Sequence, residues 1–160
     1  MIENLEVFGQ LLLAVFLGAA IGLERELAHK KAGMRTFALV ALGSCLFSII
    51  SKLGFKEFWG VTGFDPSRIA SQIVIGIGFI GAGVIVMKQN DVRGITTAAT
   101  LWVAAALGMA VGYKLYTVAV FTTLLTVAVL ILFWFVESKM VSRASGRWGR
   151  GATEADRDEN

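Results

Sequence analysis

The stretch GLERELAHKKAGMRTFALVALGS, residues 22–44, decides how this chain folds. An apolar run ends at Leu23, a segment rich in Glu, Arg and Lys occupies residues 24–35, and a second apolar run begins at Thr36. A charged segment between two apolar runs of helical length predicts a helical hairpin whose turn lies at a membrane surface. The other apolar runs are placed relative to this turn.

The composition of the whole chain predicts an integral membrane protein. Of its 160 residues, 56% are hydrophobic, and the mean hydropathy is +0.69. A soluble domain of this size leaves too much of its surface in water to bury so many apolar side chains. The apolar residues also occur in long runs, which indicates membrane-spanning helices rather than the alternating strands of a membrane barrel.

The runs predict the fold class, an all-α membrane protein built as a bundle of five transmembrane helices. Residues 1–136 are expected to form the transmembrane domain, and residues 137–160 a basic, partly disordered cytoplasmic tail. The second run is short for a hydrocarbon core of about 30 Å, so it must extend into its flanks, be shielded by neighbours or form a re-entrant helix. The predicted spans cover about residues 5–23, 36–50, 69–87, 95–112 and 115–136.

The distribution of Lys and Arg predicts how the bundle is oriented. Cytoplasmic segments of membrane proteins carry an excess of these residues. With residues 24–35 in the cytoplasm, 11 of the 15 Lys and Arg residues lie on the cytoplasmic side. We therefore expect the N-terminus outside and the C-terminus inside. Because the first residues lack the basic region of a secretory signal, we expect the first run to be a retained helix.

Glycine and alanine recur at helical spacing in several predicted spans. Small residues four apart lie on one face of a helix and let another backbone approach closely. In the third span the same residues could instead mark a backbone that opens to a cavity. The glycines predicted to pack helices together are Gly18, Gly22, Gly76, Gly78, Gly81, Gly83, Gly108 and Gly112.

The predicted topology brings residues 24–35 and the short charged turn at residues 88–94 to the same cytoplasmic side. Ionisable residues at membrane depth are costly, and a group of them is a hypothesis for function. The alternative is ordinary anchoring, in which basic side chains reach the interface and Glu24 pairs with a neighbouring arginine. The polar cluster predicted to bind or to function consists of Glu24, Arg25, Glu26, Arg35, Thr36, Arg93, Thr96 and Thr97.

The residue types that enzymes and metal sites need are sparse. The chain has one His and one Cys, and Cys45 falls inside a predicted span. We therefore expect no enzyme activity, no metal site, no cofactor and no nucleic acid partner. The two charged turns hold six Lys and Arg residues against three acidic ones, so this surface suits an anion or an acidic partner better than a cation.

Two blocks of sequence resemble the signatures of the MgtC/SapB family of bacterial inner-membrane proteins. They are GAAIGLERELAHKKAGMRTFALVALGSCLFS at residues 18–48 and QIVIGIGFIGAGVIVMKQNDVRGITTAATLWVAAALGMAVG at residues 72–112. The resemblance implies a multi-pass protein of the bacterial inner membrane, linked to low magnesium, acid tolerance and survival inside host cells. It also implies a membrane-protein partner such as the F-type ATP synthase. Thr96 stands where the family's namesake has Asn, and the chain is similar to the short members that lack a C-terminal soluble domain.

We therefore expect a regulatory protein that adapts the cell to stress by binding a membrane partner or a cytoplasmic anion. The alternative is a transporter of magnesium or another ion. Magnesium prefers carboxylate and water oxygens, and the carboxylates nearest to the cytoplasmic ends of the spans, Glu24 and Glu26, lie beside Arg25. The expected surroundings are the lipid bilayer and, through the small-residue faces, a homo-oligomer.

Overall fold

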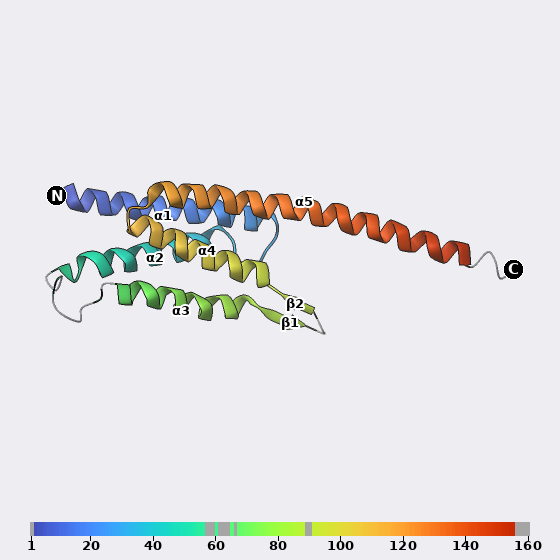
Figure 1. Ribbon diagram of the computed structural model, residues 1–160, viewed down its shortest axis with the longest axis horizontal. Coiled ribbons are helices and arrows are strands. Elements are labelled where there is room, and N and C mark those ends of the chain that lie inside the picture. Colours follow the sequence, from blue (N-terminus) through green and yellow to red (C-terminus); the bar gives the residue numbers. More distant parts are fainter. Residues whose placement is uncertain (1, 57–59, 61–64, 66, 89–90, 156–160) are drawn as a thin grey trace. The chain divides into compact units, whose positions relative to one another are not determined.

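A computed structural model of the protein describes residues 2–56, 60, 65, 67–88 and 91–155, with side chains described for residues 4–56, 60, 65, 67–87 and 91–140. Two short antiparallel strands join α3 to α4 (Figure 1). In order along the chain, the described elements are α1 (Ile2–Leu27), α2 (Met34–Leu53), α3 (Ser67–Val84), β1 (Val86–Lys88), β2 (Asp91–Arg93), α4 (Ile95–Gly112) and α5 (Tyr116–Ala155).

Among the described residues, five helices are long and apolar enough to cross a membrane. This confirms the predicted all-α membrane fold with five spans; the orientation of the bundle stays a prediction. The second span is not short, because α2 begins at Met34 and ends at Leu53. At about 1.5 Å per residue, this helix covers the hydrocarbon core. Of the alternatives for the second span, extension into its flanks is therefore the one observed.

The third span was predicted to cover residues 69–87, and its predicted end was wrong. Helix α3 ends at Val84, and Val86–Lys88 pairs with Asp91–Arg93 as a β-hairpin. The chain then enters α4 through Gly94, whose φ of 95° is the left-handed region that glycine adopts readily. A Cβ on Gly94 would also collide with the carbonyl oxygen of Val84. The hairpin and this tight turn connect α3 to α4.

The chain divides into two compact units, residues 1–126 and residues 127–160. In the first unit, α1, α2 and α4 lie side by side (Figure 1). Their contacts bury large side chains, with Ile21, Phe37 and Leu101 fully buried. Within α5, residues 116–140 form the apolar part of the helix, and the helix continues to Ala155, beyond the predicted end of the span at residue 136.

The predicted packing glycines fall into two groups. In α1 and α4 they touch the backbone of α2: a Cβ on Gly18 would lie 2.6 Å from the Phe37 carbonyl oxygen, and one on Gly108 would collide with the Ala41 carbonyl. Gly22 faces the Cα of Met34 in the same way. In α3, by contrast, a Cβ on Gly81 would contact the side chain of Ala98, whereas one on Gly76, Gly78 or Gly83 would meet no atom of the described residues within 4 Å.

Candidate functional site

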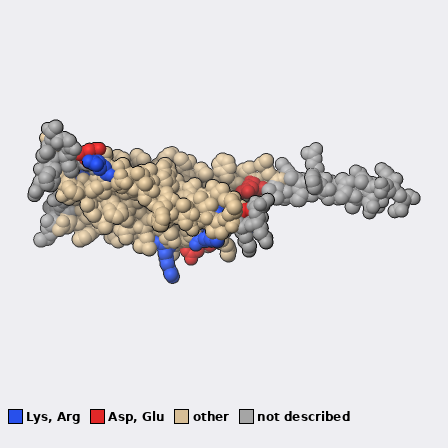
Figure 2. Space-filling model, turned by 90° about the horizontal axis from the view of Figure 1, so that it is seen from below, with Lys and Arg blue, Asp and Glu red and all other residues tan. Residues whose placement is uncertain are grey.

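The candidate site lies at the end of the first unit where α1 ends and where α2 and α4 begin. The β-hairpin lies at this same end (Figure 1). On the face shown in Figure 2, the described charged side chains form two groups separated by an uncharged band. This pattern fits a helical bundle whose charged residues lie at the two surfaces of a membrane.

Arg25 is the buried member of the cluster. It is 4% exposed, and its guanidinium forms a two-pronged ion pair with the carboxylate of Glu24. Nε donates to Oε2, and Nη2 donates to Oε1 over 2.6 Å. A buried guanidinium without a partner would be strongly destabilising, so the carboxylate is required here. The structure thus contains the pair expected between Glu24 and a neighbouring arginine.

Glu26 supplies a helix cap. Helix α2 begins after Gly33, which has no side-chain oxygen to accept a hydrogen bond from the first turn. The Oε2 atom of Glu26 accepts one from the backbone N–H of Met34 over 3.0 Å. An acidic oxygen at a helix N-terminus satisfies an unpaired donor and complements the helix dipole. Glu26 therefore stabilises the turn between α1 and α2.

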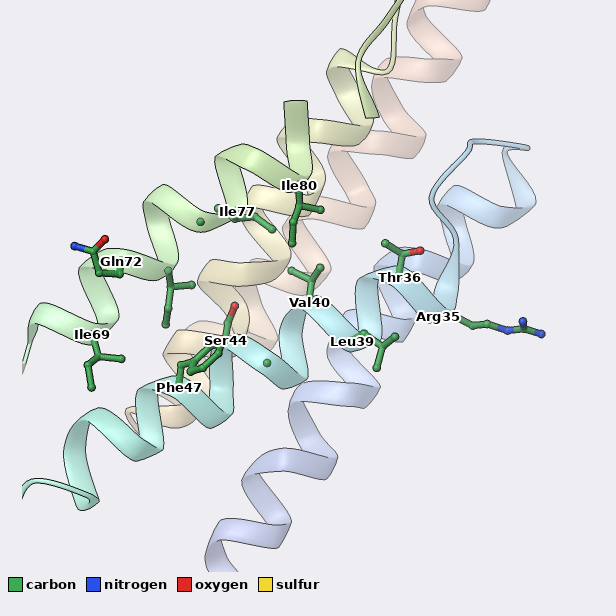
Figure 3. A pocket seen from close by; sticks show the side chains of 13 residues that line it. Arg35, Thr36, Leu39, Val40, Ser44, Phe47, Ile69, Gln72, Ile77 and Ile80 are labelled. Carbon is green, nitrogen blue, oxygen red and sulfur yellow. The ribbon is translucent and has the colours of Figure 1, made fainter. Parts of the chain in front are cut away.

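Arg35 is exposed at one end of a groove between α2 and α3. The cavity there measures about 700 Å³, and Figure 3 shows the Arg35 side chain pointing away from α3. Within the described part of the chain, its guanidinium forms no hydrogen bond or ion pair. The groove is otherwise mostly apolar, and its lining residues are Arg35, Thr36, Leu39, Val40, Gly43, Ser44, Phe47, Ile69, Gln72, Ile73, Gly76, Ile77 and Ile80.

Arg93 lies on β2, where its Nε donates to Oδ2 of Asp91 over 2.7 Å. Its side chain is 72% exposed, so this ion pair contributes little to stability. The two threonines that follow differ. Thr96 is exposed and Thr97 is buried in the first turn of α4. The backbone oxygens of both accept hydrogen bonds from the hydroxyl of Thr100, over 2.6 and 3.1 Å.

The structure places the predicted cluster at one end of the bundle but in separate parts. Glu24, Arg25 and Glu26 stabilise the turn between α1 and α2. Arg93, Thr96 and Thr97 belong to the hairpin and the first turn of α4. Among the residues described, no hydrogen bond or ion pair joins these two groups. Also within the described residues, no three His, Cys, Asp or Glu side chains gather as they would to hold a metal ion.

Sequence reasoning gave no role to two polar residues of α1, Glu6 and Gln10. Glu6 forms an ion pair of 2.6 Å with Lys114. Gln10 is 4% exposed, and its Nε2 donates to the carbonyl oxygens of Val111 and Gly112 over 2.7 and 3.2 Å. The signal was present in the sequence, since these are polar residues four apart, and thus on one helix face, inside the first predicted span.

These features define a class, a multi-pass helical membrane protein that has, at one end of its bundle, a Glu–Arg pair whose arginine is buried. The chain matches the MgtC family over residues 11–139, and it belongs to that family. The family assignment predicted from the two sequence blocks is therefore confirmed. No solved structure matches the chain.

Three named relatives support the same assignment. The chain is 42% identical over 136 residues to "Putative magnesium transporter YhiD" of Escherichia coli strain K12, covering 84% of this chain and 63% of the relative. It is 42% identical over 130 residues to protein SapB of Bacillus subtilis, covering 78% and 55% of the two chains. It is 45% identical over 116 residues to protein MgtC of Brucella abortus, covering 72% and 46%. The chain thus spans about half to two thirds of the length of these relatives.

Proposed function

We propose that this protein is a regulator of stress adaptation in the bacterial inner membrane that binds an anionic ligand or an acidic membrane partner through Arg35. The observation that carries the proposal is the difference between two arginines of the cluster. The guanidinium of Arg25 is buried and saturated by Glu24. That of Arg35 is exposed and forms no ion pair within the described residues, so its donors are available to a carboxylate or phosphate.

The surroundings of Arg35 support a binding role. It follows directly on the first residue of α2, where backbone N–H groups and the helix dipole favour negative charge. Thr36 is beside it, and Arg93 adds a second exposed guanidinium at the same end of the bundle. An acidic surface that meets this end would gain attraction from both arginines.

The setting of this function comes from the family. The conditions that we propose for this role are low magnesium, acid and growth inside host cells. The membrane partner that we propose first is the F-type ATP synthase. The predicted orientation would put Arg35 and Arg93 in the cytoplasm. A homo-oligomer in which α3 meets a second copy is part of the same proposal, since Gly76, Gly78 and Gly83 leave open space on that helix.

The second candidate function is transport of magnesium, which the name of the YhiD relative favours. Magnesium needs oxygen ligands, carboxylates above all. The carboxylates described near the helix ends are already engaged: Glu24 by Arg25, Glu26 by the N–H of Met34 and Glu6 by Lys114. Regulation by binding therefore fits this geometry better than transport.

The test is growth of a strain that lacks its own copy of the gene, at low magnesium and at acid pH, with variants supplied in trans. We expect Arg35→Ala to abolish the growth benefit while accumulating normally in the membrane, and Arg35→Lys to restore part of it. Lys31→Ala, an exposed cation in the same turn, is the matched control and should behave as the wild type. Full growth with Arg35→Ala would overturn the proposal.

A further inference from the structure

A second polar site lies at the opposite end of the first unit, where α1 begins and α2 and α4 end. A cavity of about 160 Å³ is bounded there by residues from three helices and two turns. Its polar lining differs from the apolar groove beside Arg35. The residues that matter for its chemistry are Glu6, Gln10, Lys52, Lys56, Gly112 and Lys114.

Most of the charged side chains that line this cavity are basic. Three lysines line it from separate segments: Lys52 from the last turn of α2, Lys56 from just after that helix, and Lys114 from the turn between α4 and α5. Among the described lining residues the carboxylate is that of Glu6, whose Oε1 is 2.6 Å from the Nζ of Lys114. The described lining therefore holds more basic than acidic side chains and favours a ligand with several anionic oxygens.

Gln10, which also lines the cavity, contributes an acceptor. Gln10 is almost fully buried, and both contacts of its amide nitrogen go to the carbonyl oxygens that end α4. These contacts fix which end of the amide is the nitrogen. Its Oε1 accepts no hydrogen bond from the residues that the structure describes. A ligand in this cavity would therefore meet basic side chains and one amide oxygen that can accept a hydrogen bond.

Ordinary anchoring explains part of this arrangement. A lysine in the last turn of a helix complements the helix dipole, as Lys52 does in α2. It does not explain Lys114, which adopts the left-handed conformation with a φ of 64° directly after the C-cap of α4. Glycine or asparagine usually occupies such a position. A lysine at this strained position, paired with a carboxylate beside a cavity, indicates a role for its side chain.

We propose that this cavity binds a phosphate group that carries a neighbouring hydroxyl. The anionic oxygens would lie among Lys52, Lys56 and Lys114, and the hydroxyl would donate to Oε1 of Gln10. Two sources offer this chemistry at a membrane surface: the headgroup of phosphatidylglycerol, and free hydrogen phosphate. The site is separate from the Arg35 end of the bundle, so the proposal goes beyond the regulatory function.

The experiment uses the purified full-length protein in detergent. Native mass spectrometry measures retention of phosphatidylglycerol against phosphatidylethanolamine, and calorimetry measures binding of inorganic phosphate. We expect Lys52→Gln to weaken binding of the favoured probe about tenfold, as loss of one charge-assisted hydrogen bond implies. Lys52→Arg should retain binding. Lys31→Gln, which makes the same charge change at the other end of the bundle, should bind as the wild type.

The two measurements distinguish a lipid headgroup from free phosphate as the ligand. Retention of phosphatidylglycerol without a phosphate signal assigns the site to a lipid headgroup, and a phosphate signal that competes with the lipid assigns it to the free ion. Lys56→Gln, at an exposed residue, gives a second measure should Lys52→Gln fail to fold. The proposal would be overturned if the wild type, Lys52→Gln and Lys56→Gln bound each probe equally well. It would also be overturned if none of the three proteins bound either probe.

Discussion

The two sides of α2 differ in how closely their neighbours approach. On one side, α1 and α4 bring glycines against its backbone, with Gly18 at Phe37 and Gly108 at Ala41. On the other side, α3 leaves a cavity of about 700 Å³, and Gly76 on that helix has no atom near the place of its missing Cβ. Glycines at similar spacing thus serve tight packing on one side of α2 and leave a groove on the other.

This difference extends to the charged residues. Arg25 belongs to the packed side and is held by Glu24, whereas Arg35 lies at the end of the open groove and is exposed. A tightly packed region tolerates little change, because neither a void nor an extra atom can be absorbed by its neighbours. We therefore infer that the packed side maintains the scaffold and that the open side is available for binding.

The largest effect on stability is expected from Arg25→Ala. The change leaves the carboxylate of Glu24, whose side chain is 14% exposed, without its partner. Loss of one member of a buried pair costs roughly 3–5 kcal/mol. Unfolding of the purified protein in mixed micelles should show this loss, and Arg35→Ala should leave the unfolding free energy unchanged. Equal losses in the two variants would abolish the contrast between the packed and open sides.

The next largest effect is expected from Gly108→Ala. Even one methyl group would collide with the Ala41 carbonyl, a backbone atom that cannot swing aside. Overpacking of this kind costs about 1–3 kcal/mol. Gly78→Ala in α3 is the matched control: it meets no atom and should be neutral or slightly stabilising, because alanine favours helix. Thermal unfolding of the two variants in detergent compares them directly, and a loss in Gly78→Ala as large as that in Gly108→Ala would refute the difference in packing.

A smaller effect is expected from Glu26→Ala, which removes the acceptor for the Met34 N–H at the start of α2. Loss of a helix cap costs about 1 kcal/mol. The same unfolding assay measures it, with Lys30→Ala as the control for an exposed charge in the same turn. An unchanged unfolding free energy in Glu26→Ala would mean that water replaces the cap.

The smallest effect is expected at the start of α3, on the open side. Hydrogen bonds from the side chain and the backbone of Ser67 lower the pKa of Asp65 below its usual value of 3.8. A carboxyl whose pKa is lowered in the folded state stabilises that state above the usual pKa and loses the contribution as the pH falls through the lowered value. Helix content followed by circular dichroism should fall slightly more on acidification in the wild type than in Asp65→Asn. Identical acid titrations would show that Asp65 adds nothing to α3.

The sequence was sufficient for features that depend on local composition. The five spans follow from long apolar runs, and the pair of Glu24 with an arginine follows from the cost of charge at membrane depth. The end of α3 was missed by three residues, because a three-residue strand leaves a signal too short to distinguish from a helix end.

Features that depend on how the helices pack against one another could not be predicted from the sequence. The spacing of Gly78 and of Gly108 gives no indication that one faces open space and the other a carbonyl. In the same way, Arg25 and Arg35 both flank a charged turn, and only the packing of the helices decides that one is buried and the other exposed. Glu6 and Gln10 are different, since their four-residue spacing within an apolar run could have predicted a shared polar face.

We propose that this protein acts by binding at its surface rather than by moving ions through its bundle. The most direct test is magnesium flux into proteoliposomes that hold the purified full-length protein and a magnesium-sensitive dye, with protein-free liposomes as the blank. We expect no flux above the blank from protein that is shown to be folded. A magnesium flux above the blank that scales with the amount of protein would contradict it and would establish a transporter.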